Sequence, residues 1–126
     1  METKKTLVLR LIKQGLILFI LPLAVWVLVE SARGESALTR VASSHTCMGS
    51  NQAQEKPQDY ALVDGRPYYG CTDMCIANLK QNPGFRYSLD PVSGKRVDKA
   101  WAIVGARKNG QLLYFESEEN FLSYRE

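Results

Sequence analysis

Three cysteines are the residues of this chain best suited to chemistry. Cys71 and Cys75 lie four positions apart in the segment YYGCTDMCIANL, residues 68–79, and Cys47 lies upstream of both. Thr72 can cap a helix that starts after Cys71, and the unpaired N–H groups of such a helix start stabilise a thiolate. Cys75 would lie one turn further along the same helix face. If a loop brings Cys47 to the same point, three converging thiolates suit Cu(I) or Zn(II).

Other interpretations of the cysteines stay open from the sequence alone. A Cys47–Cys71 or Cys71–Cys75 disulfide would leave one thiol free, and all three residues could instead be plain buried side chains. The only histidine, His45, is the best candidate for a fourth metal ligand, with a chance surface position as the alternative. Two thioethers are weaker candidates that matter only for copper: Met48 and Met74. No second histidine or evident base accompanies the thiols, so we predict no enzyme activity.

A hairpin and a helix must position these residues. The strand-like stretches YALV (60–63) and RPYYG (66–70) flank Asp64-Gly65, which is a strong two-residue hairpin signal. The helix that follows the Thr72 cap is expected to run to about Gln81, where Asn82-Pro83-Gly84 stops it.

The same order of elements recurs in the second half. AWAIVGAR (100–107) and QLLYF (111–115) flank a Lys-Asn-Gly turn, and Ser117 can cap a second helix. A shift of about 46 residues superimposes the two aromatic pairs, 68–69 and 114–115, which we expect in the core. The same shift places three residues without thiols on the cysteine positions: Ser93, Ser117 and Phe121. We therefore predict two tandem α+β copies packed as one domain.

The first 34 residues have the pattern of an export signal. A flank with four basic residues precedes an uncharged run over residues 15–29, and Ala32-Arg33-Gly34 offers a cleavage step after Gly34. If the segment is not cleaved, it would serve as a hydrophobic anchor helix in the membrane. Either outcome predicts a periplasmic protein, free or anchored in the inner membrane and facing the periplasm.

The charges separate this leader from the rest of the chain. Of 16 basic and 13 acidic residues, residues 1–34 hold five and two, which leaves 11 of each sign beyond them. A neutral exported part without a basic stripe argues against nucleic acid as a partner. Residues 35–45 are small and polar and are expected to form a linker, and residues 46–126 to form the folded domain. A core of that size commonly needs disulfides or a metal as a staple.

Two motifs resemble known metal-binding families. Cys47 followed by YYGCTDMC is similar to the TRASH domain, a cysteine module of heavy-metal trafficking, resistance and sensing. DPVSGKRVDKA (90–100) with NGQLLYFESEENFLSY resembles the related YHS domain. The resemblance covers residues 46–126, with a cysteine-bearing copy at 46–89 and a degenerate copy at 90–126, where Lys95 stands in place of a methionine.

The resemblance implies a small treble-clef-like fold and a metal site at Cys47, Cys71 and Cys75. It also implies an exported protein that buffers or hands over copper, zinc or a similar ion, with a metal transporter or efflux component as partner. The alternatives are a thiol–disulfide protein and a structural interaction module. The thiol–disulfide alternative is weakened because C-x3-C is not the C-x-x-C of thioredoxin-like proteins.

Overall fold

The computed structural model describes residues 38–126, and the predicted signal or anchor segment at 1–34 lies outside them. Residues 38–126 form one compact unit of mixed α+β structure. Within the described residues, no helix is both long and apolar enough to cross a membrane.

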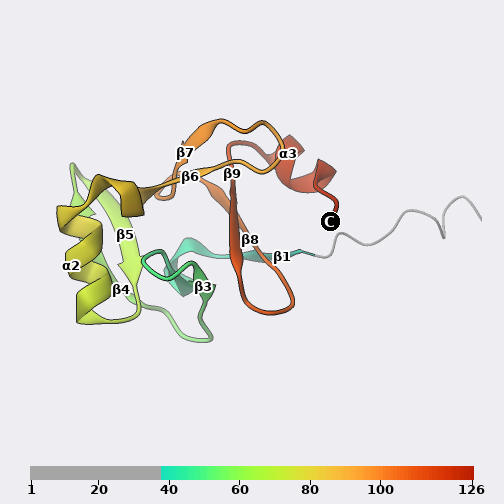
Figure 1. The fold of residues 1–126 in the computed structure, drawn as a ribbon. Helices are drawn as coiled ribbons and strands as arrows, with labels where there is room; N and C mark the ends of the chain where they lie inside the picture. The colour runs from blue at the N-terminus through green and yellow to red at the C-terminus, as the bar shows by residue number, and fades with distance from the viewer. Residues whose placement is uncertain (1–37) are drawn as a thin grey trace, which may run out of the picture. The chain divides into compact units, whose positions relative to one another are not determined.

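Short antiparallel sheets and two helices make up this unit (Figure 1). One sheet has three strands in the order β1-β8-β9, and the others are the pairs β2-β3, β4-β5 and β6-β7. The strands are β1 (Thr39–Val41), β2 (Thr46–Cys47), β3 (Gln52–Ala53), β4 (Asp59–Val63), β5 (Arg66–Gly70), β6 (Tyr87–Leu89), β7 (Arg96–Asp98), β8 (Ile103–Ala106) and β9 (Leu112–Phe115). The helices are α2 (Asp73–Gln81) and α3 (Glu118–Ser123), with 3-10 turns η1 (Ser43–His45) and η2 (Pro83–Arg86).

The first hairpin and helix have the predicted boundaries. Asp64 and Gly65 both have positive φ, 52° and 75°, as a two-residue hairpin turn between β4 and β5 requires. The Thr72 hydroxyl caps α2 by accepting a hydrogen bond from the N–H of Cys75 at 3.2 Å. The helix ends before Pro83, as predicted.

The second hairpin and helix follow the same order, with one difference in the first strand. Ser117 caps α3 and accepts a hydrogen bond from the N–H of Asn120 at 3.1 Å. Strand β8 begins at Ile103, so the prediction of a strand from residue 100 was wrong. Residues 98–102 form a turn there. The Asp98 side chain accepts a hydrogen bond from the N–H of Ala100, and its carbonyl accepts from the N–H groups of Trp101 and Ala102.

The predicted linker is part of the fold from residue 38 onward, which corrects the boundary at residue 46. Strand β1 pairs with β8, with Thr39 opposite Ala106 and Val41 opposite Val104. Leu38 is buried against Phe115 and Phe121, and η1 follows β1. This edge strand is held by backbone hydrogen bonds and largely exposes its polar side chains, so its composition resembles that of a linker.

Aromatic side chains form the centre of the core, as predicted. Tyr68, Tyr114 and Phe115 are at most 1% exposed, while Tyr69 is partly buried. Tyr68 packs with Met48 and Leu79 beneath α2. Figure 1 shows α2 with the β4-β5 hairpin at one end of the unit and the β8-β9 hairpin with α3 at the other.

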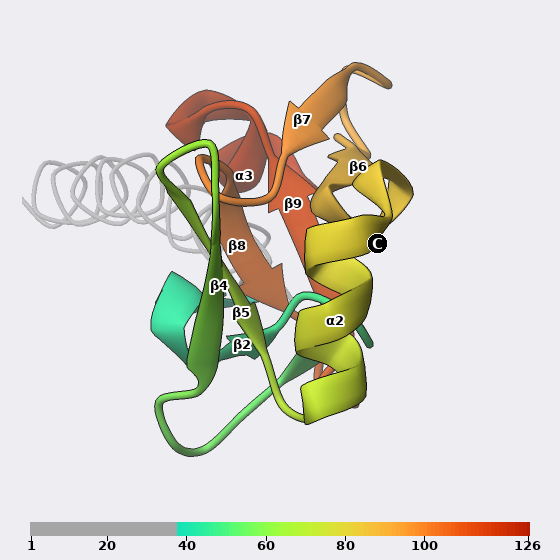
Figure 2. The same cartoon turned by 90° about the vertical axis from the view of Figure 1, so that its left-hand side faces the viewer.

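Asp98 at the end of β7 joins the two hairpin-helix units. Its carboxylate accepts hydrogen bonds from Arg66 Nη1 at 2.6 Å and from the Tyr68 hydroxyl at 2.9 Å, both in β5. A backbone hydrogen bond also connects the two halves of the chain, since the N–H of Ala53 donates to the Gly110 carbonyl at 2.8 Å. Figure 2, viewed from the α2 end, shows the β4-β5 hairpin in front of β8 and β9.

We expect Asp98→Ala to lower the free energy of unfolding by about 1–3 kcal/mol, because it leaves the buried Tyr68 hydroxyl without its acceptor. Urea unfolding monitored by circular dichroism measures the change. In a double-mutant cycle with Tyr68→Phe, the two losses should be less than additive, since both variants remove the same bond. Additive losses would show that this contact does not couple the units.

Candidate metal centre

The three cysteine sulfurs converge on one point. All three Sγ atoms lie within 4.8 Å of one another, and Cys71 Sγ is 3.8 Å from Cys75 Sγ. Zn–S bonds of about 2.3 Å in tetrahedral geometry place two sulfurs about 3.8 Å apart. A disulfide needs about 2.05 Å, and all three cysteines are free thiols. The cluster can therefore hold a metal ion, as the spacing predicted.

Cys47 reaches the cluster from a tight loop. It is the last residue of β2, and the chain turns back through residues 48–51 into β3, where Cys47 pairs with Gln52. The N–H of Met48 donates to the Tyr69 carbonyl at 2.8 Å, which fastens the loop to β5. Asn51 closes the loop with a φ of 56°, in the left-handed region that asparagine tolerates.

Cys71 and Cys75 lie on either side of the α2 cap. Cys71 follows β5 directly and precedes the cap residue, and Cys75 is the third residue of the helix. The backbone N–H of Cys71 donates to Cys47 Sγ at 3.1 Å, so the buried sulfur is bonded to the start of the helix. The hydroxyl of Ser50 lies 3.9 Å from Cys71 Sγ.

Glycines allow the loop and the helix to approach each other. A Cβ atom at Gly49 would lie 2.8 Å from Cys75 Cβ and 2.9 Å from its sulfur, closer than real Cβ contacts. At Gly70, a Cβ would meet the Ile76 side chain at 3.0 Å and Cys75 Cβ at 3.3 Å. The sequence reasoning missed both glycines, although each lies within two residues of a cysteine.

Cys47 loses its proton at a lower pH than Cys71 does, because its pKa is lowered. Burial raises the pKa of Cys47, but hydrogen bonds from the side chains and backbones of Cys71 and Ser50 outweigh it and bring the pKa to about 7. The hydrogen bond to Cys47 raises the pKa of Cys71 to about 11, and burial adds to the rise. Near neutral pH, Cys71 therefore keeps its proton until a metal displaces it.

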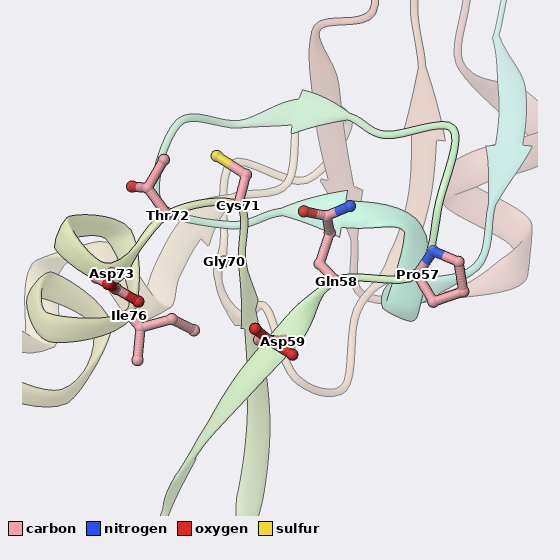
Figure 3. A pocket seen from close by; sticks show the side chains of 8 residues that line it. All are labelled: Pro57, Gln58, Asp59, Gly70, Cys71, Thr72, Asp73 and Ile76. Atoms are coloured by element: carbon pink, nitrogen blue, oxygen red, sulfur yellow. The ribbon is translucent and has the colours of Figure 1, made fainter.

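The cluster is open on one side. Cys47 is completely buried, Cys75 is half-buried and Cys71 is exposed. A shallow polar hollow of about 170 Å³ lies beside Cys71, lined also by Asp59 and Asp73. Figure 3 shows the Cys71 sulfur pointing away from both carboxylates, and the other two cysteines do not line the hollow. The hollow therefore adjoins the metal centre and is not the metal centre itself.

The other predicted ligand candidates lie elsewhere. His45 is in η1, where its Nδ1 is 3.2 Å from the Ser44 hydroxyl, and it does not belong to the group of converging donor atoms. Met48 is fully buried in the core with Tyr68, and Met74 is 74% exposed on α2. The structure thus brings the three cysteines together, and His45, the candidate for a fourth ligand, does not join them.

Both hairpin-helix units have a side-chain cap at the start of the helix, Thr72 in the first and Ser117 in the second. The residue before the second cap is Glu116, and the third helical residue is Asn120. The predicted counterparts of the cysteines, Ser93, Ser117 and Phe121, follow from aligning the aromatic pairs. Aligning the caps instead places Glu116 and Asn120 opposite Cys71 and Cys75.

A buried carboxylate links the loop after β6 to the start of α3. Asp90 Oδ2 accepts from the backbone N–H of Glu116 at 2.8 Å and from Asn120 Nδ2 at 2.9 Å. Its Oδ1 accepts from the N–H groups of Val92 and Ser93 at 2.7 and 3.2 Å. These bonds hold the pKa of Asp90 below its usual value despite burial, which acts to raise it.

Comparisons with known proteins give no match for this chain. No protein-family model matches it, and neither the curated proteins nor the solved structures contain a significant match.

We predict that Gly49→Ala weakens metal binding at least tenfold, because the added methyl group must push Cys75 away from the other two sulfurs. A competition titration with a chromophoric chelator measures the affinity. Gly84→Ala is the matched control, since its new methyl would meet only Asn82 Oδ1, at 3.2 Å. Equal affinities of Gly49→Ala and wild type would show that the close approach does not set the geometry of the site.

We also predict that metal binding near pH 8 releases the proton of Cys71, whose pKa lies at about 11. The apparent affinity should then rise about tenfold per pH unit for each proton displaced. Calorimetry in two buffers of different ionisation enthalpy counts the protons. Cys71→Ser should release one proton fewer, and an equal count in both proteins would contradict the assignment.

Proposed function

We propose that this protein binds a thiophilic heavy-metal ion, Cu(I) or Zn(II), through the thiolates of Cys47, Cys71 and Cys75. The observation that carries the proposal is the convergence of three sulfurs within 4.8 Å, from a loop, a strand end and a helix start. Soft sulfur donors in this number select Cu(I) and Zn(II) over hard cations such as Mg²⁺. The role is binding and not catalysis.

The order of elements supports the resemblance to TRASH and YHS domains. A tight loop with the first cysteine, a hairpin and a helix with the last cysteine follow one another, as expected for a treble-clef-like unit. On this proposal, the second unit is a degenerate copy in which Asp90 replaced the metal as the cross-link between loop and helix. The copy then supplies core packing and a counterpart for the first unit.

The open side of the site suits transfer of the ion. Cys71 is exposed, so a thiol of a second protein can reach a bound metal and exchange ligands with it. We infer an exported protein, periplasmic or anchored in the inner membrane and facing the periplasm, on the basis of the leader at 1–34. Its partner in trafficking, buffering or resistance is then a metal transporter or efflux component.

A thiol–disulfide protein is the second candidate, favoured by the exposed Cys71 with Cys75 3.8 Å away. The distribution of acidity argues against it. The thiol with the lowered pKa is Cys47, which is completely buried, whereas a redox nucleophile must be both acidic and accessible.

Elemental analysis and a free-thiol count on the purified protein test the proposal. We expect one metal ion and three metal-protected thiols per chain, and a large loss of affinity in Cys47→Ser, Cys71→Ser and Cys75→Ser. Ser93→Ala is the control in the second unit and should keep the metal. His45→Ala should also keep it, since His45 is outside the cluster.

Two results would contradict the proposal. Equal metal content in the wild type and all three cysteine variants would exclude thiolate ligation. A stable disulfide with one free thiol and no metal would favour the redox candidate.

A further inference from the structure

A buried lysine lies next to the loop of the metal centre. Lys99 is 3% exposed, and its ammonium donates to the Met48 carbonyl at 2.9 Å and to Asn51 Oδ1 at 2.8 Å. The ammonium also lies 5.1 Å from the centre of the Tyr114 ring. Every one of these partners is electrically neutral.

This ammonium has no carboxylate partner. Of the ion pairs formed by residues 38–126, none includes Lys99, and Asp98 beside it in sequence is bound to Arg66 and Tyr68. A buried charge without a counter-charge is strongly destabilising. A negative group nearby would offset this cost.

Lys99 is bound to the loop that carries the first cysteine of the cluster. Two of the Lys99 partners, Met48 and Asn51, belong to the loop that begins at Cys47. Burial lowers the pKa of Lys99 to about 8, and the charge of Cys47 acts in the opposite direction. The pKa of Tyr114 is raised by burial and further by the same charge on Cys47.

We propose that Lys99 is the built-in counter-charge of the metal–thiolate centre, supplied to the first unit by the second. The inference rests on the proposed function. Three thiolates carry three negative charges, so a centre with Zn(II) retains one and a centre with Cu(I) retains two. With Lys99 included, the Zn(II) centre is neutral and the Cu(I) centre carries a single negative charge.

The two residual charges give the inference a measurable signature. The site with Cu(I) carries one more negative charge than the site with Zn(II), and both form from the same free protein. The loss of the ammonium should therefore weaken Cu(I) binding more than Zn(II) binding. A merely structural effect of the substitution would weaken both metals by the same factor. The ratio of the two losses therefore separates a counter-charge from a packing residue.

The test measures Zn(II) and Cu(I) affinities of the full chain by chelator competition in the wild type, Lys99→Met and Lys99→Gln. We expect Cu(I) binding to be weakened about tenfold more than Zn(II) binding in both variants. Lys95→Gln removes an exposed lysine of the second unit and should change neither affinity. If Lys99→Met does not fold, Lys99→Gln, which can keep a donor near Met48, provides the same comparison.

The outcomes distinguish the two proposals. Tight metal binding by the wild type with unchanged or equally weakened affinities in the Lys99 variants would overturn the counter-charge and leave the metal centre intact. Absence of metal binding by the wild type would overturn the proposed function and the counter-charge together.

Discussion

The candidate metal centre depends on the contact between the loop after β2 and the first turn of α2. Gly49 leaves no side chain between them, so the backbone of the loop lies directly against Cys75. The backbone N–H of Cys71 then reaches the buried sulfur of Cys47. Close packing of main chain on main chain, and not any single strong bond, sets the distances among the sulfurs.

The two hairpin-helix units use different side chains to join a loop to the start of a helix. Each must join a loop, a strand end and a helix start around a buried acceptor. The first uses the Cys47 sulfur, and the second uses the Asp90 carboxylate, which already has four hydrogen-bond donors. The carboxylate is saturated within the protein, whereas the three sulfurs could still bind an external ion. Among residues 38–126, the group of side chains that could hold a metal ion is the cysteine cluster of the first unit.

Local signals in the sequence predicted the elements that position the cysteines. The Asp64-Gly65 turn, the Thr72 cap and the Pro83 stop act within a few residues, so the first hairpin and α2 have the expected bounds. Contacts between distant segments were not predictable in this way. Strand β1 is polar and is held by its partner β8, and Lys99 reads as a surface residue in a charged stretch. The bonds from Asp90 to Glu116 and Asn120 likewise join segments that are distant in the sequence.

Strand β1 also fixes the order in which the three-stranded sheet can be completed. All three cysteines precede β8 in the chain, while β1 can join the sheet only after β8 exists. A chain that emerges from its N-terminus first, from a ribosome or across a membrane, therefore presents Cys47, Cys71 and Cys75 before this sheet can form. During that interval the thiols are open to oxidation.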